Sequence, residues 1–336
     1  MARTSDMKHW PLLREYPALA QTLAPLALAG LPTPVQAIPA LGANAWIKRD
    51  DISHPVYGGN KIRKLEFVLA DIQRHGARAV ITFGATGTNA GIAASMVCAQ
   101  AGLVCSIITF PQEETATVQE NRRWLAHFKA RQEAQPSLWR AVLRFYLHPA
   151  RLRRDHYFLF AGCSNPVSTF GYLNAAFELR EQIRAGLCPE PAEIIVPVSS
   201  ASTLAGLNLG VALAGLKSQV RGIRVAAEKL GPFAACTPGL VKKMQDDALH
   251  TMQRQERSIT LPATPAVFMD GNYFGAGYGR GTEKAAQAMR IMTQATGLPL
   301  ESTYSGKAAA AFLDRLSRNA EPILFWNTFN SHQLPS

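Results

Sequence analysis

A lysine at the start of a helix-like pattern is the residue best suited to covalent chemistry in this chain. Apolar residues recur at helical spacing over residues 62–72, and Lys61 directly precedes them. This spacing predicts that Lys61 lies on the core-facing side of the helix, whereas Arg63 and Glu66 point away from it. Two glycines at 58–59 would let the backbone approach a ligand closely.

The chemistry open to this lysine depends on its surroundings. In apolar surroundings a lysine loses hydration, and its pKa falls. The neutral amine is the form that attacks a carbonyl to make a Schiff base. Taken alone, Lys61 favours a side chain that reaches back to solvent from the first turn of an ordinary helix, because fully buried lysines are rare.

A hydroxyl-rich loop follows one of the predicted strands. Residues 194–198 have the apolar composition of a buried strand, and a helix is expected from residue 204. At the N-terminus of that helix, free N–H groups and the helix dipole would favour an anion. A plain Ser/Thr capping loop is the simpler alternative. The loop consists of Ser199, Ser200, Ala201, Ser202 and Thr203.

Three further segments carry candidate site residues. Thr88 and Asn89 can cap a helix that extends to about residue 102. The glycine cluster at 275–279 contains Tyr278, but its spacing is not that of a dinucleotide-binding loop, so we discount that function. Residues 301–307, which include tyrosine and serine, precede an alanine-rich helix. A helix cap at 88–89 and a packed core tyrosine at 278 remain structural alternatives.

Two segments, one before Lys61 and one around it, resemble a known family. Residues 47–51 read Ile-Lys-Arg-Asp-Asp, and residues 58–66 read Gly-Gly-Asn-Lys-Ile-Arg-Lys-Leu-Glu. They are similar to the aminocyclopropanecarboxylate deaminase and D-cysteine desulfhydrase family, whose members are pyridoxal 5'-phosphate enzymes of the tryptophan-synthase-β fold type. The resemblance implies an α/β fold of two lobes, with open parallel sheets flanked by helices. In the match, Lys61 takes the place of the Schiff-base lysine, and Asn60 that of the asparagine contacting the cofactor ring oxygen.

The resemblance assigns roles to the hydroxyl-rich loop as well. The family's phosphate cup usually reads Gly-Ser-Gly-Gly-Thr, whereas here glycine is replaced at 199, 201 and 202, and only Ser200 and Thr203 match directly. If those positions need a positive φ, serine or alanine would be strained there. The cofactor contacts implied are Lys61, Asn60, Ser199, Ser200, Ala201, Ser202, Thr203 and Ser305.

The same resemblance implies a substrate site. It gives Thr88 and Asn89 a role in binding the substrate carboxylate and Thr88 a possible part in catalysis, although the family's glutamine and histidine beside them are missing. Tyr278 and Tyr304 match active-site tyrosines near the substrate. Ser305 matches the residue that faces the pyridine nitrogen, where a neutral hydroxyl suits elimination better than transamination. The predicted catalytic residues are therefore Lys61, Thr88, Tyr278 and Tyr304.

The activity implied is that of a lyase or deaminase. It would abstract the α-proton of a small amino acid and eliminate the β-substituent, giving an α-keto acid and ammonia. The substitutions at 87–90, 199–202 and 327–330 leave the substrate open. Racemisation, β-replacement, ring formation in specialised metabolism, and a catalytically degenerate pyridoxal-phosphate-binding protein remain alternatives.

The order of the predicted elements indicates how the lobes are built. Strands at 79–83 and 104–110 enclose a helix, which indicates a βαβ unit in a parallel sheet. We expect residues 1–60 and 165–336 to form a large cofactor-binding lobe, and residues 61–164 a small one. Within the small lobe, a basic insert covers roughly 112–155. Residues 230–262 carry no pattern that predicts an element.

Composition and charge indicate which classes of partner this chain binds. The net charge is +11, and residues 122–154 contain nine Lys or Arg against one acid, Glu133. Arg140 and Arg144 lie among apolar residues at helical spacing, which predicts an amphipathic helix with a solvated basic face. A small-molecule partner, without nucleic acid or membrane, is therefore expected. Five scattered cysteines favour the cytoplasm and no metal site, and the resemblance implies a homodimer.

Overall fold

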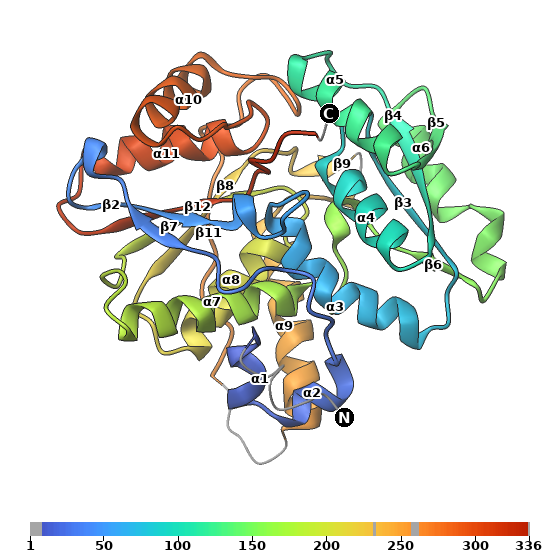
Figure 1. Cartoon of the computed structure of the whole chain (residues 1–336), viewed down its shortest axis with the longest axis horizontal. Helices are drawn as coiled ribbons and strands as arrows, with labels where there is room; N and C mark the ends of the chain where they lie inside the picture. The colour runs from blue at the N-terminus through green and yellow to red at the C-terminus, as the bar shows by residue number, and fades with distance from the viewer. Residues whose placement is uncertain (1–8, 231–232, 257–261, 335–336) are drawn as a thin grey trace.

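Two parallel sheets dominate the structure, which is a computed structural model describing residues 9–230, 233–256 and 262–334 (Figure 1). The larger sheet has the strand order β1-β2-β12-β7-β8-β11. Only β1 is antiparallel to its neighbour in this sheet. Its strands are β1 (Val35–Ala37), β2 (Ala45–Arg49), β12 (Ile323–Asn327), β7 (Glu193–Val198), β8 (Gln219–Arg224) and β11 (Phe268–Asp270).

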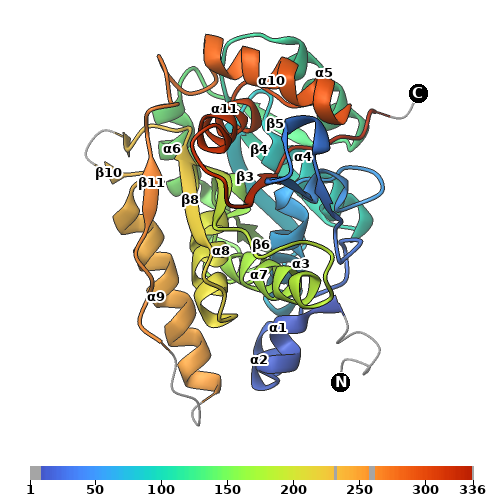
Figure 2. The same cartoon turned by 90° about the vertical axis from the view of Figure 1, so that its left-hand side faces the viewer.

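Helices cover both faces of the larger sheet. On one face, α11 (Ser305–Leu316) packs against β12, β7 and β8, and α10 (Glu283–Thr296) packs beside α11. On the other face, α7 (Thr169–Arg184) and α8 (Ser202–Leu213) form a second core. Figure 2 shows α9 (Pro238–Gln255) running beside α8. Such two-sided coverage explains why the central strands read as continuous apolar runs.

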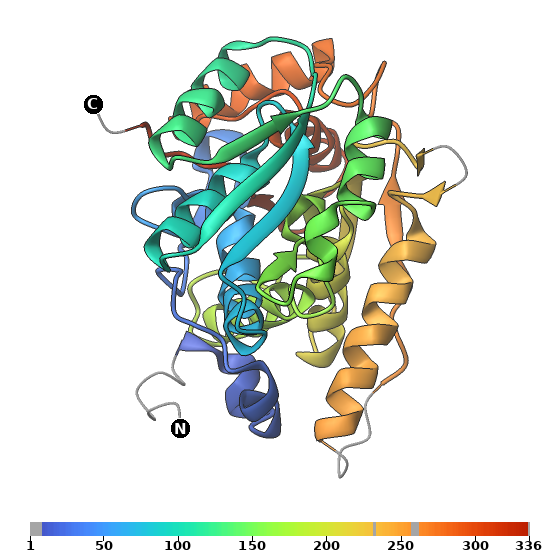
Figure 3. The same ribbon diagram turned by 90° about the vertical axis from the view of Figure 1, so that its right-hand side faces the viewer.

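The smaller sheet has four parallel strands in the order β5-β4-β3-β6 (Figure 3). One face packs against α4 (Asn89–Gln100), with α5 (Ala116–His127) next to it. The other face packs against α6 (Leu138–Tyr146). The strands are β5 (Arg131–Ala134), β4 (Val104–Phe110), β3 (Ala79–Ala85) and β6 (His156–Phe158).

Helix α3 (Asn60–Arg74) lies between the two sheets, against α7 on one side and α4 on the other. The prediction that Arg63 and Glu66 point away from the core is therefore wrong, since both are buried. Arg63 pairs with Asp50 at 2.7 Å and with Glu178 at 2.8 Å. Because most of this helix faces protein on all sides, the buried Arg63 and Glu66 take polar partners in place of water.

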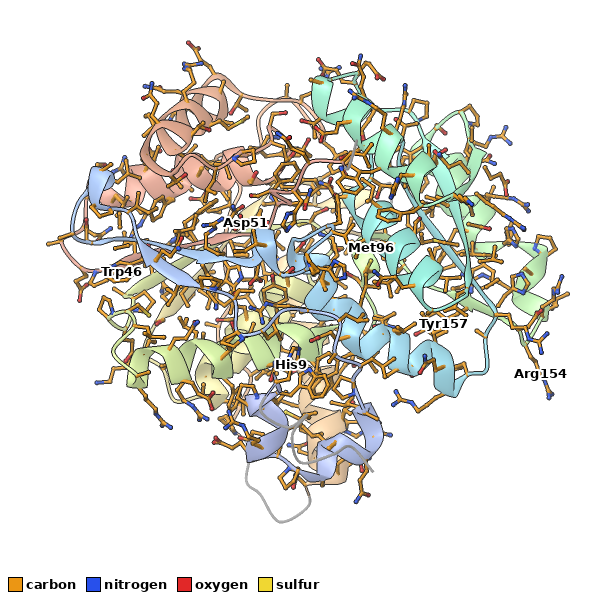
Figure 4. All side chains as sticks on the ribbon, in the orientation of Figure 1. His9, Trp46, Asp51, Met96, Arg154 and Tyr157 are labelled. Carbon is orange, nitrogen blue, oxygen red and sulfur yellow. The ribbon has the colours of Figure 1, made fainter. Side chains whose placement is uncertain are left out.

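In the basic insert, the predicted helix forms, but only some of its apolar residues are buried. The amphipathic helix forms as α6, but Ala141 and Phe145 supply its buried face, while Trp139 and Leu143 are 46% and 54% exposed. The small alanine and the flat ring fit closely against the sheet, which accounts for this choice. Further along the insert, Arg154 projects from the edge of the molecule (Figure 4).

Other boundaries differ in smaller ways. Helix α9 was not predicted, although Thr237 followed by Pro238 is a typical helix start. The apolar run at 223–227 predicts a strand there, but β8 spans Gln219–Arg224 because it pairs with all of β7. Parts of the unassigned segment 230–262 lie outside the described residues. The remaining short elements are α1 (Pro11–Glu15), α2 (Ala18–Leu23), η2 (Pro39–Leu41), η3 (Asp50–Ile52), η4 (Pro149–Leu152), η5 (Ala161–Cys163), β9 (Lys229–Leu230) and β10 (Phe233–Ala234).

The larger sheet is drawn entirely from residues 35–49 and 193–327, and the smaller one from residues 79–158. The lobe boundaries at 60/61 and 164/165 stay a prediction. Within the described ranges, no helix is both long enough and apolar enough to cross a bilayer.

Candidate active site

One pocket brings most of the predicted site residues together. It is lined by the start of α3, the start of α4, the loop between β7 and α8, and the segments before α11 and after β12. Four predicted residues, Thr88, Ser202, Tyr278 and Ser305, are not among those lining it. The eight that line it are Asn60, Lys61, Asn89, Ser199, Ser200, Ala201, Thr203 and Tyr304.

Lys61 is placed by the turn that begins α3. Gly59 has a φ of +95°, and a Cβ there would lie 2.8 Å from the Thr328 carbonyl oxygen, so only glycine fits. The Lys61 ammonium donates to Asn60 Oδ1 at 2.6 Å, and Asn60 Nδ2 donates to Thr203 Oγ1 at 3.0 Å. Burial lowers the pKa of Lys61. The amine is thus held in the pocket in surroundings that favour its neutral form.

The loop before α8 forms a cup of donors. Ala201 is the N-cap of α8 and makes no side-chain cap. Within the described residues, the N–H groups of Thr203 and Leu204 have no hydrogen-bond partner. Ser164 Oγ lies 2.7 Å from Ser200 Oγ and 2.9 Å from Ser202 Oγ, so hydroxyls occupy the space beside the cup. These free N–H groups and the helix dipole suit an anion.

The strain expected from the missing glycines occurs at one position only. Ala201 has a φ of +66° and a ψ of −38°, and the Ser202 N–H donates to the Ser200 carbonyl oxygen across it at 2.9 Å. This three-residue turn is unfavourable for an L-residue. Ser199 and Ser202 are not among the positive-φ residues.

Sequence reasoning missed a second lysine in this pocket. Lys64 is 1% exposed and donates only to the Gly162 carbonyl oxygen, at 3.2 Å, among the described residues. Gly162 packs directly against Ser200, so the ammonium lies beside the cup. Burial and the nearby Lys61 lower the pKa of Lys64. Its spacing of three residues from Lys61 was the available signal, because such residues share a helix face.

The start of α4 supplies a second set of donors. Thr88 is the N-cap, and its hydroxyl accepts the Gly91 N–H at 3.1 Å. Its side chain therefore serves the helix and does not line the pocket. Asn89 does line the pocket, and its Oδ1 accepts from Tyr57 and Asn121. Tyr57, another residue the sequence did not indicate, is itself part of the lining.

The two predicted tyrosines meet at the pocket edge. Tyr278 and Tyr304 are hydrogen-bonded through their hydroxyls. Burial raises the pKa of both, so both keep their protons near neutral pH. Ser305 is fully buried and bonds within its own turn to Glu301, whose carboxylate caps α11 by accepting the N–H groups of residues 303–305. Glu301 lines the pocket and was missed, since it resembles an ordinary cap.

The donor set fits one kind of cofactor. An amine of lowered pKa suits an aldehyde, while an uncapped helix N-terminus with a buried lysine beside it suits a phosphate. No group of three or more His, Cys, Asp or Glu that could hold a metal ion occurs in the ranges that the structure describes. A pocket of this kind between two parallel α/β sheets defines an enzyme that binds a phosphorylated aldehyde.

Comparison with known proteins gives the family. The chain belongs to the pyridoxal-phosphate dependent enzyme family, whose sequence profile matches residues 26–328. It is 30% identical over 318 residues to a D-cysteine desulfhydrase of Klebsiella pneumoniae (strain 342), covering 90% of this chain and 93% of that protein. The crystal structure of an aminocyclopropanecarboxylate (ACC) deaminase homologue matches with a TM-score of 0.78 and 26% identity, covering 93% and 94% of the two chains.

More distant structures share the fold. The processed form of threonine deaminase isoform 2 from Solanum lycopersicum matches with a TM-score of 0.64 at 14% identity, covering 95% of this chain and 90% of that one. The predicted family, the fold class and pyridoxal 5'-phosphate as cofactor are confirmed. The protein is a pyridoxal-phosphate-dependent enzyme of the lyase and deaminase kind.

Proposed function

We propose that this protein acts on a small amino acid, removing the α-proton and eliminating the β-substituent to give an α-keto acid and ammonia. The desulfhydrase and the deaminase homologue among its relatives support this reaction class. The observation that carries the proposal is the Lys61 amine, which lies in the pocket with its pKa lowered by burial.

Each part of the pocket has a proposed task. When bound, pyridoxal phosphate supplies an electron sink that stabilises negative charge at the substrate Cα. Lys61 would hold the cofactor through its aldehyde, and its free amine would take the α-proton. Asn60 keeps the Lys61 amine in place through its 2.6 Å contact. The cup at 199–203, with Lys64 beside it, holds the phosphate.

The substrate is proposed to bind between α4 and the tyrosine pair. Asn89 and the first N–H groups of α4 receive the carboxylate, because a helix N-terminus favours an anion. Tyr278 and Tyr304 share one hydrogen bond and keep their protons, so they can donate to the departing β-group. Thr88 supports this site from the cap of α4, and Ser305 keeps a neutral hydroxyl at the start of α11.

A panel of amino acids tests the reaction. Purified protein is given D- and L-cysteine, D- and L-serine and 3-chloroalanine, each of which carries an α-proton and a β-leaving group, and keto acid and ammonia are measured. Borohydride reduction followed by mass spectrometry should place the cofactor on Lys61. Lys61→Ala should abolish keto acid release, whereas Lys284→Ala, at a residue whose side chain is 75% exposed, should not.

Two results would count against the proposal. A Lys61→Ala variant that releases keto acid at the wild-type rate would exclude Lys61 as the base. Cofactor-loaded protein that releases no keto acid from any amino acid in the panel would exclude the elimination. A homodimer in the cytoplasm is proposed alongside, and the five buried free cysteines fit a reducing compartment; light scattering tests the dimer.

A further inference from the structure

The amide of Asn89 is held in place by a side chain from the basic insert. Asn121, on α5, is only 4% exposed. Its Nδ2 donates to the Gly87 carbonyl oxygen at 2.7 Å and to Asn89 Oδ1 at 2.7 Å. The insert therefore reaches the pocket indirectly, through a residue that the pattern of the sequence did not single out.

The direction of these bonds follows from the chemistry of the groups. A backbone carbonyl only accepts hydrogen bonds, so the Asn121 atom next to Gly87 must be the nitrogen. The second proton on that nitrogen points at Asn89, which must therefore present its oxygen. Tyr57 donates to the same oxygen at 3.1 Å, and burial raises the pKa of Tyr57, so it keeps the proton.

The consequence is that the Asn89 NH₂ group has a fixed direction. With Oδ1 taken by two donors, Nδ2 is turned away from Asn121 and Tyr57. Within the described residues, Nδ2 has no hydrogen-bond partner, and Asn89 lines the pocket together with Lys61. The N–H groups of Asn89 and Ala90, at the start of α4, are also without a partner there.

We infer that Asn121 is a positioning residue for substrate recognition: it keeps the Asn89 NH₂ turned into the pocket, where it selects ligands that carry a carboxylate beside their amine. This inference rests on the proposed function, since it concerns the same site. Were the Asn89 amide reversed, its oxygen would face the carboxylate, and a donor would be replaced by a repelling acceptor.

Two substitutions separate this role from a purely structural one. Asn121→Asp offers an acceptor, so the Asn89 amide should reverse to donate to it. Asn121→Ala removes one of the two donors without adding charge, so Tyr57 alone holds the Asn89 amide and its orientation is less fixed. The matched control is Asn44→Asp, because Asn44 Nδ2 also donates to a backbone carbonyl, that of Asn319 at 2.7 Å, outside the pocket.

Alanine and ethylamine are the probes, since they differ only by the carboxylate. Each is titrated into the cofactor-loaded protein, and binding is followed through the change in cofactor absorption. For Asn121→Asp we expect the alanine Kd to rise about ten- to hundredfold and the ethylamine Kd to stay within about twofold. Asn121→Ala should raise the alanine Kd by a smaller factor, and Asn44→Asp should change neither.

The outcomes are decisive in either direction. A selective loss of alanine binding in both Asn121 variants supports the inference. Equal losses for alanine and ethylamine, or none for either, would overturn it, as would a loss in Asn121→Asp alone, which points to simple charge repulsion. Alanine carries no β-leaving group, so these measurements do not depend on elimination, and failure of the proposed reaction would be seen separately in the keto acid assay.

Discussion

Replacing Ala201 by glycine should leave the stability nearly unchanged or increase it, although the same change elsewhere in α8 should be harmful. Ala201 combines a φ of +66° with a ψ of −38°. Backbone conformations of this kind cost about 1–3 kcal/mol when the residue is not glycine. The cup that we assign to the cofactor phosphate is thus strained at its centre, and glycine would release that strain.

The size of the effect follows from three terms. Loss of the buried methyl group costs about 0.8 kcal/mol, and the extra freedom of glycine in the unfolded chain costs about 0.4–1 kcal/mol. For Ala201 these costs are offset by the strain release. For Ala205, which is fully buried inside α8, no strain is released and these costs remain. The difference between the two variants should therefore be about 1–3 kcal/mol.

Urea unfolding measures this difference. Both variants and the wild type are compared with the cofactor removed and with it at saturation, because bound cofactor adds its own stabilisation. We expect Ala205→Gly to lower the free energy of unfolding and Ala201→Gly to leave it close to the wild-type value. Equal destabilisation by the two changes would refute the strain argument and with it the view that the cup needs glycine geometry at 201.

Three further predictions concern the buried charges. Lys64→Met should weaken pyridoxal phosphate binding about tenfold or more but leave pyridoxal, which lacks the phosphate, unaffected; equal losses for both ligands would contradict the phosphate role. Arg63→Met leaves the buried Asp50 without its ion-pair partner and Glu178 with Lys48 alone, and should destabilise by about 3–5 kcal/mol in urea unfolding. The exposed Arg153→Met should serve as an unchanged control. Finally, Arg63 and its neighbours lower the pKa of Asp50 from 3.8 to about 2. The stability from ionised Asp50 is therefore present above pH 4 and lost as the pH falls through about 2, so a pH series should show this loss in the wild type and a smaller one in Arg63→Met.

Elements with both a periodic pattern and a local end signal were predicted well. Strand β4 has the predicted bounds of 104–110. The pattern from Lys284 to Thr296, closed by Gly297, predicts a helix, and α10 begins one residue earlier, at Glu283. Thr282 caps α10, and Gly297 ends it with a φ of +70°. These local signals are decided by backbone hydrogen bonding within a few residues, so they do not depend on the rest of the fold.

The charged residues of α3 could not be predicted in the same way. A periodic pattern assumes one buried face, but α3 packs against both α4 and α7. Glu66 illustrates the result: it is 1% exposed and accepts from the backbone N–H groups of Leu28 and Ala29 and from the Trp10 indole. These partners lie up to 56 residues away in the chain, so no local window contains them.

Family resemblance and tertiary contacts point to different residues of the site. Lys61 and four residues of the cup (Ser199, Ser200, Ala201 and Thr203) line one pocket, and their roles stay a prediction. Asn121 was missed because it is a neutral residue in a basic insert, and nothing in the residues around it indicates a role in the pocket. Its role rests on a carbonyl 34 residues away, which only the fold brings into contact.

Helices α3 and α8, which line the pocket, begin differently from α5, α9 and α10. Helices α5, α9 and α10 each begin with a threonine whose hydroxyl accepts a first-turn N–H. Helix α8 begins with Ala201, which cannot do so, and the N–H groups of Thr203 and Leu204 have no partner among the described residues. At α3, which begins with Gly59, the Thr328 carbonyl oxygen accepts the Asn60 N–H at 3.2 Å instead. Because free N–H groups at a buried helix start favour an anion, an uncapped helix whose first N–H groups meet no backbone acceptor indicates an anion site. Helix α4 is a related case: Thr88 caps only the Gly91 N–H, which leaves the first two N–H groups for a carboxylate.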